Sequence, residues 1–248
     1  MIELKTPEEI KKMRAGNLIV AEILSRIQEE AKPGVTTADL ERLAEKLLAK
    51  KRAVSAFKNY QGYPSTLCTS VNEGVIHGIP SKRVLKEGDI LSVDFGVFYR
   101  GYYGDAAISI PIGSVSDEAQ RLLDTAEEAL YQAIDKARVG NRLSDISAAI
   151  QSYVEQRGFS VVRDFVGHGI GRKLHEEPQI PNFGPPGMGV RLKAGMVLAI
   201  EPMINAGKSE VTILSDGWSA VTKDRSLSAH FEHSVAITEN GPFILSKP

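Results

Sequence analysis

The chain has 248 residues, of which 42% are hydrophobic and 25% are charged; these proportions are typical of a globular protein and exclude a disordered or fibrous one. Thirty basic against 31 acidic residues give a net charge of −1, which argues against nucleic acid as the main substrate. With one cysteine, no secretory signal and no apolar run near the roughly 20 residues of a membrane span, we expect no intramolecular disulfide, no membrane partner and a cytoplasmic location.

Two helices are predicted before the first strands. Thr6 followed by Pro7 and Glu9 is typical of a helix start, with Thr as N-cap, Pro at the first helical position and Glu closing a capping box. Apolar residues then recur at steps of three and four until the break at 32–34. A second helix is expected from about Thr37, followed by strand-like sequence.

The same order of elements recurs later in the chain. Leu85–Asp94 matches Leu192–Glu201 at an offset of 107 residues, and the Ala-x-x-Gly turn at 31–34 recurs 106 residues later. A Gly turn leading into an apolar strand could arise by chance, but two matches at nearly one offset favour an internal duplication. We therefore expect one domain, 1–248, made of two α+β halves, roughly 6–112 and 113–248.

Asp94 and Asp105 are the first candidates for chemistry. If Tyr99 and Arg100 form a two-residue hairpin loop, Asp94 and Asp105 become direct cross-strand neighbours, with Cβ atoms about 4.5–5.5 Å apart. Two carboxylates that close repel each other unless a cation or proton is shared between them. The alternative is a pair of aspartates turned to solvent at a sheet edge.

The second half adds two more acids. Glu201 occupies the position equivalent to Asp94, after an apolar run, and Glu232 begins another β-rich segment. If the halves pack about a pseudo-twofold axis, four carboxylates converge. Two divalent cations would balance their charge, and a water ionised between those cations would be a nucleophile at neutral pH. The pattern predicts a dinuclear metal site.

Three histidines lie in apolar segments that contain glycine: His77, His168 and His175. Each one alone could be an ordinary core histidine, but glycines on both sides of His168 would give a ligand access to its imidazole. The glycine spacing at 167–171 does not fit a dinucleotide-binding loop, and Pro178 would interrupt the helix that such a loop needs.

Motifs of other enzyme classes are missing. The sequence has no His-Glu-x-x-His, no Walker loop and no Gly-x-Ser-x-Gly. Cys68 has no neighbour in sequence that would lower its pKa, so we interpret it as a small buried hydrophobic residue and not as a nucleophile.

These residues and their flanking motifs resemble the type I methionine aminopeptidases over essentially the whole chain. The resemblance implies the pita-bread fold, with pseudo-twofold helix-helix-sheet halves around a central antiparallel sheet. The motifs that carry this resemblance are Asn72-Glu73, His77-Gly78-Ile79-Pro80, Gly167-His168-Gly169-Ile170-Gly171, His175-Glu176-Glu177-Pro178, Glu201-Pro202-Met203 and Phe231-Glu232-His233.

The resemblance also implies a role for each site residue. Asp94 would chelate one metal, Asp105 and Glu232 would bridge both, and His168 and Glu201 would complete the second. The residue Glu201 would in addition be the general base. His77 and His175 would act beside the metals, contacting substrate and the developing oxyanion.

The implied reaction is removal of the N-terminal methionine from nascent polypeptides, preferentially when the second residue is small. Tyr60, Tyr63, Cys68 and Trp218 would line the methionine pocket, although ordinary aromatic packing is their alternative interpretation. Leu174 and Phe57 depart from the family pattern. Two divalent cations per chain are implied, with Co, Mn, Fe and Zn all compatible. A monomer acting near the ribosome is the family expectation.

Two other readings stay open on sequence grounds. A proline-directed enzyme such as prolidase or aminopeptidase P shares the fold but usually carries an extra N-terminal domain, and only about 70 residues precede His77. A metal-free binding module would have lost ligands, whereas all five ligand types are present. The helical insertion of type II methionine aminopeptidases has no room between His175 and Glu232.

Overall fold

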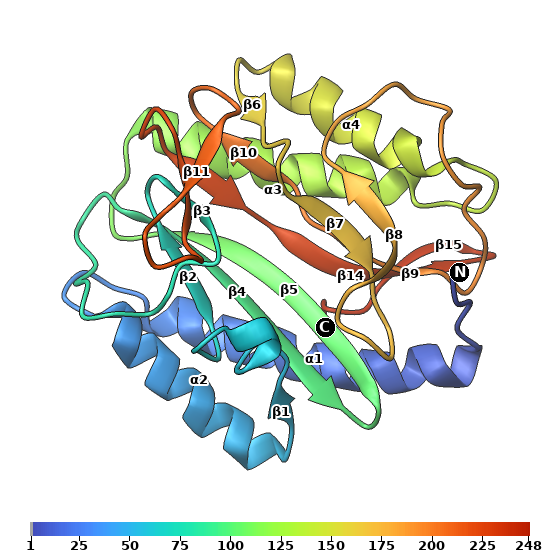
Figure 1. The fold of residues 1–248 in the computed structure, drawn as a ribbon, viewed down its shortest axis with the longest axis horizontal. Coiled ribbons are helices and arrows are strands. Elements are labelled where there is room, and N and C mark those ends of the chain that lie inside the picture. Colours follow the sequence, from blue (N-terminus) through green and yellow to red (C-terminus); the bar gives the residue numbers. More distant parts are fainter. Residues whose placement is uncertain (1) are drawn as a thin grey trace.

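A nine-stranded sheet forms the centre of the computed structural model, which describes residues 2–248 (Figure 1). Its strands run in the order β1-β4-β5-β14-β9-β7-β8, with β2 also paired to β4 and β15 to β14, and all these pairs are antiparallel. Their bounds are β1 Val54–Ser55, β2 Cys68–Val71, β4 Ile90–Tyr99, β5 Tyr102–Pro111, β7 Val166–Gly169, β8 Glu176–Pro181, β9 Val197–Ile200, β14 Glu232–Thr238 and β15 Gly241–Ile244.

Two small sheets complete the β structure. The first has the order β13-β10-β6 and the second β11-β12-β3. Their bounds are β3 Gly74–Ile76, β6 Ser160–Val161, β10 Met203–Asn205, β11 Val211–Ile213, β12 Ala220–Thr222 and β13 Ser228–His230, and a 3-10 turn covers Tyr60–Gly62.

Four α-helices are present within residues 2–248: α1 Pro7–Glu30, α2 Thr37–Lys51, α3 Asp117–Lys136 and α4 Leu143–Glu155. In Figure 1, α1 and α2 lie together below the sheet strands, and α3 and α4 lie together above them. The expected pita-bread α+β fold is confirmed. In the same part of the chain, no helix is both long and apolar enough to cross a membrane.

Both predicted helix starts are confirmed. The Thr6 hydroxyl accepts a hydrogen bond from the Glu9 N–H, and the Glu9 carboxylate accepts one from the Thr6 N–H at 2.8 Å. Thr36 and Asp39 form the same reciprocal cap on α2. Each cap satisfies backbone donors that the first helical turn leaves without partners.

The helices pack against one face of the sheet and bury its side chains in the core. Leu91, Val93 and Phe95 of β4 are fully buried in the cluster that α1 and α2 contribute to. Leu198 of β9 and Val235 of β14 pack in a second cluster with α3 and α4. Since successive side chains on a strand alternate between faces, the residues between these positions point away from the helices.

The β4–β5 hairpin differs from the prediction by two residues. Its loop is Arg100-Gly101, so Asp94 lies opposite Ala107 and Asp105 lies opposite Gly96. The residues Arg100 and Gly101 have φ angles of +52° and +86°, the left-handed pair that a tight hairpin turn needs and that Gly at its second position favours. Asp94 and Asp105 are therefore diagonal neighbours on one face and not direct partners.

Equivalent features appear in both halves of the fold. An isolated antiparallel bridge joins Thr36 to Val84 before α2, and another joins Arg142 to Arg191 before α4. These bridges lie at the 106- and 107-residue offsets of the sequence matches. We propose on this basis that the halves, roughly 6–112 and 113–248, are an internal repeat.

Candidate metal centre

Five ionisable side chains meet on the face of the sheet that the helices leave free. Asp94 lies on β4, Asp105 on β5, Glu232 at the start of β14, Glu201 directly after β9 and His168 on β7. These are five adjacent strands of the sheet, and all five side chains line one cavity of about 130 Å³. The structure thus brings together the whole set that the sequence predicted as ligands.

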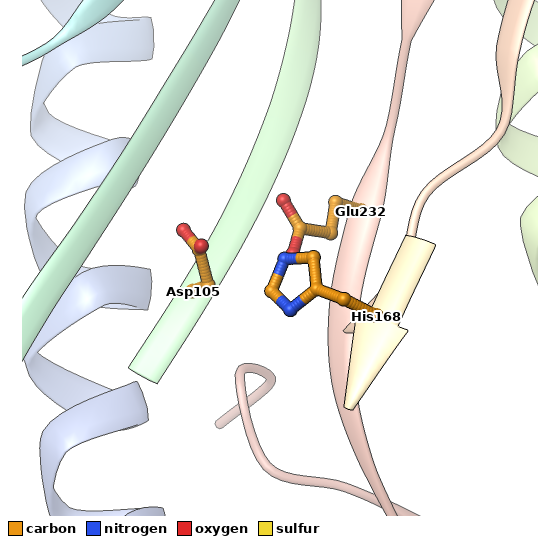
Figure 2. A group of neighbouring side chains, drawn as sticks. All are labelled: Asp105, His168 and Glu232. Atoms are coloured by element: carbon orange, nitrogen blue, oxygen red, sulfur yellow. The ribbon is translucent and has the colours of Figure 1, made fainter. Parts of the chain in front are cut away.

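Asp105, His168 and Glu232 form the tightest group, and Figure 2 shows them pointing toward one another from three strands. One potential ligand atom from each lies within 4.8 Å of the others, and all three residues are buried. This spacing and this donor set suit a divalent cation.

If all four acids of this cavity were ionised, their charge would be too costly to bury without compensation. Removal from water raises the pKa of Asp94 to about 7 and that of Glu201 to about 8, and it lifts the pKa values of Asp105 and Glu232 well above their usual range. One carboxylate oxygen each of Asp94, Asp105 and Glu232 is buried without a hydrogen-bond partner. A bound cation would satisfy these oxygens and restore the ionised state, so the donor set fits a metal.

His168 is prepared to act as a neutral ligand. Its Nδ1 lies 2.9 Å from the Gly169 carbonyl oxygen, so Nδ1 carries the hydrogen and Nε2 keeps its lone pair. Burial lowers the pKa of the imidazole to about 3, which keeps it neutral. Its Nε2 lies 3.5 Å from a carboxylate oxygen of Glu201.

The glycines on either side of His168 have a steric role that was not predicted from the sequence. A Cβ on Gly167 would lie 2.5 Å from the Ala199 carbonyl oxygen, and one on Gly169 would lie 2.2 Å from that of Glu177. These glycines allow close approach of neighbouring strand backbones.

His77 and His175 lie beside the ligand cluster. The His175 ring stacks edgewise on His168, with ring centres 4.4 Å apart, and its Nδ1 is 2.8 Å from the Tyr60 hydroxyl. Burial lowers the pKa values of both histidines, to about 4 for His77. His77 has a φ of +58°, and its ring lies against Phe165.

The other end of the cavity is aromatic and apolar. The Tyr63 and Trp218 rings meet edge to face at 5.1 Å, and the Tyr63 hydroxyl donates to the Leu67 and Gly78 carbonyls. Cys68 is buried, and burial raises its pKa well above the usual range, in agreement with the apolar interpretation. The remaining apolar lining includes Phe57, Tyr60 and Leu174.

One residue of the site was missed from the sequence. His230, only 1% exposed, places Nε2 3.5 Å from the second carboxylate oxygen of Glu201, and this Nε2 has no hydrogen-bond partner. Two imidazoles therefore flank Glu201. The position two residues before Glu232 was the available signal, because alternate residues of an extended chain share a face.

Comparison with known proteins places this site in a family. The profile of metallopeptidase family M24 matches residues 11–239. The chain belongs to metallopeptidase family M24. Its buried acid and histidine cluster agrees with the metal dependence that the family name states, so we assign divalent metal binding to this M24 chain.

Relatives of this M24 chain match it from end to end. A methionine aminopeptidase from Clostridium acetobutylicum is 54% identical over 247 residues, covering 99% of both chains, and methionine aminopeptidase 1 from Bacillus subtilis is 51% identical over the full length of both. The crystal structure of methionine aminopeptidase from Thermotoga maritima superposes with a TM-score of 0.99 at 50% identity, over 100% of each chain.

More distant structures share the fold alone. Prolidase from Pyrococcus horikoshii aligns with a TM-score of 0.79 at 21% identity, and this chain covers 63% of that longer chain. The fold is therefore shared with a peptidase of another name, and specificity must be argued from the cavity.

Proposed function

We propose that this protein removes the N-terminal methionine from nascent polypeptides, preferentially when the second residue is small, using two divalent cations. The supporting observation is the convergence of Asp94, Asp105, His168, Glu201 and Glu232 in one buried cavity with an aromatic end. Relatives at up to 54% identity over the full chain carry the name methionine aminopeptidase. We place the reaction in the cytoplasm, near the ribosome, with the protein as a monomer.

The five ligands divide between the two cations in this proposal. Asp94 would hold the first cation, His168 and Glu201 would hold the second, and Asp105 and Glu232 would be shared by both. The cations would supply Lewis-acid activation of the first peptide carbonyl and a lowered pKa for bound water. Co, Mn, Fe and Zn are all compatible with four carboxylates and one imidazole.

His175 is the proposed hydrogen-bond donor to the scissile carbonyl. In this proposal the Tyr60 hydroxyl, which lies 2.8 Å from Nδ1, donates to that nitrogen and leaves the hydrogen on Nε2. The lowered pKa keeps the ring neutral, so the donor is an Nε2–H group and not an imidazolium. This hydrogen bond strengthens as negative charge develops on the carbonyl oxygen. His77, which also lines the cavity, is proposed to contact the substrate backbone.

Glu201 is the proposed general base. Its carboxylate lines the cavity among the other proposed ligands, where a bound cation would keep it ionised and able to accept a proton. His168 and His230 lie on either side of its carboxylate, each with Nε2 3.5 Å from one of the two oxygens.

Methionine is the side chain that we propose for the aromatic end. Tyr60, Tyr63, Cys68 and Trp218 enclose an apolar space beside the acids, with Phe57 and Leu174 closing the lining. An unbranched thioether adapts its shape to such a space and makes favourable contacts with aromatic rings. The free α-amine of the substrate would lie against the acidic end.

The test is a turnover assay on Met-Ala-Ser with elemental analysis, before and after chelation, with Mn, Co, Fe or Zn added back. Metal-dependent release of free methionine is expected. Acetyl-Met-Ala-Ser and Met-Leu-Ser are the controls for the free amine and the small second residue. Release from an Ala-Pro substrate but not from Met-Ala-Ser would replace the proposal by a proline-directed peptidase, and no release from either would indicate a binding module.

A further inference from the structure

A buried lysine near the start of the chain supports the loop that carries His175. The Lys5 side chain is 1% exposed, and its ammonium lies 2.7 Å from a carboxylate oxygen of Glu176, whose side chain is 13% exposed. Glu176 directly follows His175 and begins β8. This pair thus joins two segments that are 171 residues apart in sequence, at the residue next to the proposed oxyanion donor.

Glu176 uses both of its oxygens to fix this loop. One accepts from Lys5, and the other accepts from the Lys173 backbone N–H at 3.1 Å. The second bond closes the turn before His175. The start of the loop is fixed separately, since Tyr103 N–H donates to the Gly171 carbonyl at 2.8 Å.

Lys5 is itself held firmly. Its ammonium also donates to the Glu3 carbonyl at 3.2 Å, and its backbone N–H donates to the Gly195 carbonyl at 2.7 Å. The side chain passes directly beside Gly171, where an added Cβ would lie 2.3 Å from Lys5 Cε. Only glycine at 171 leaves this path open.

An exposed ion pair next to this one provides a comparison. Arg172, in the same loop, pairs with Glu9 at 2.9 Å, but its side chain is 56% exposed. Exposed pairs contribute little because water and salt screen them, whereas a buried pair that loses one partner leaves an uncompensated charge. The buried pair therefore determines where the loop lies.

We propose that Lys5, through Glu176, is a positioning residue for His175 in the peptidase reaction. The inference rests on the proposed function, in which His175 donates to the carbonyl oxygen. Four of the five proposed metal ligands lie on β4, β5 and β14 and after β9, none of which pairs with β8. His168 lies on β7 beside Gly169, the residue opposite Glu176, so metal affinity is measured for each variant. Misplacement of a reacting group by 1 Å can lower the rate by about 100-fold.

The test compares Lys5→Met, Lys5→Arg and Glu176→Gln with Lys11→Met, which makes the same change at an exposed site on α1. With saturating metal and Met-Ala-Ser, Lys5→Met is expected to lower kcat about 10-fold or more, with KM within about 2-fold and metal affinity unchanged. Lys5→Arg should restore most of kcat, and Lys11→Met should match the wild type. Should Lys5→Met fail to fold, Glu176→Gln replaces it, since its amide oxygen still accepts from Lys173.

Two further readouts separate positioning from general destabilisation. In a His175→Ala background, adding Lys5→Met should lower kcat no further, because the two changes act through one group. The ring nitrogen resonances of His175 in NMR spectra should shift in Lys5→Met and stay unchanged in Lys11→Met. Unchanged His175 resonances, or an equal loss of kcat in both backgrounds, would overturn the proposal. If the wild type releases no methionine with any metal, the proposed function fails, and the NMR comparison still decides whether Lys5 positions His175.

Discussion

The two halves of the molecule supply different donors to one cavity. The first half contributes Asp94 and Asp105 from the continuous β4–β5 hairpin, whose strands run for ten residues each. In the second half β9 ends after four residues, and Glu201 stands before Pro202. Proline has no N–H for the sheet, so the chain leaves the ladder at this point and continues into β10 of another sheet.

Asp94 and Glu201 show what this difference does to chemistry. They occupy matching positions in sequence, and burial raises the pKa of both. One oxygen of Asp94 is without a hydrogen-bond partner, whereas each oxygen of Glu201 has an imidazole nitrogen at 3.5 Å. One side of the cavity therefore offers oxygen donors alone, and the other offers nitrogen donors and a supported base. If the halves are the internal repeat that we propose, equivalent positions thus give a site with two chemically different ends.

Removing one acid from the first half should have the largest effect. Asp105→Asn barely changes volume but removes a charge that we propose bridges both cations. Since a catalytic metal contributes several kcal/mol, activity should fall about 100- to 1,000-fold, with a matching loss of metal in elemental analysis. Circular dichroism should show the fold retained, and Asp117→Asn, at an exposed position on α3, should behave as wild type. Normal turnover by Asp105→Asn would exclude the bridging role.

Replacing His230, a histidine of the second half that is not a proposed ligand, should have an intermediate effect. His230→Asn takes away one of the two groups beside Glu201, and loss of such a supporting contact typically lowers metal affinity or activity about 10- to 100-fold. Calorimetric metal titration and kcat measure the two quantities separately. His233→Asn is the control, since His233 is also largely buried but lies beside Tyr131 of α3, on the helix side of the sheet. Equal effects of both substitutions would argue against a specific role for His230.

Local sequence rules predicted the parts of the fold that depend on neighbouring residues. The Thr6–Glu9 cap needs only four consecutive residues, so it was predictable from sequence. Asp94 and Glu201 were found because each follows an apolar strand, and the resemblance to a known family fixed the full set of five proposed ligands.

What the sequence left open depends on register and on distant contacts. The Asp94–Asp105 pairing was wrong by two residues because the loop was placed at Tyr99-Arg100, whereas Gly101 can adopt the positive φ that the turn requires. The face that Asp105 occupies was still right, because a shift of two residues preserves alternation. The sequence did not reveal His230 or Lys5, because each contacts a residue that is distant in sequence. His230 lies beside Glu201 and Lys5 pairs with Glu176 only in the folded chain.

The smallest effect that we predict is a pH dependence of stability in the metal-free protein. Buried acids with raised pKa values, about 7 for Asp94 and about 8 for Glu201, hold protons in the folded state that the unfolded chain has already released. Stability must therefore fall as pH rises toward these folded-state values.

The buried histidines act in the opposite direction, since their pKa values are lowered, to about 3 for His168, but they are neutral in both states well above pH 6.5. Between about pH 7 and 8 most histidines of the unfolded chain are already neutral, so the acids outweigh them and decide the sign, and each extra bound proton contributes about 1.4 kcal/mol per pH unit. Urea unfolding of the chelated protein should give a free energy of unfolding that decreases over this pH range. The Glu201→Gln variant should show a smaller decrease. Saturating metal should abolish the decrease, because a cation keeps the acids ionised in the folded state. A free energy that rises with pH in the chelated protein would mean that these four acids are already ionised without metal, and the need for a cation would then lose its electrostatic basis.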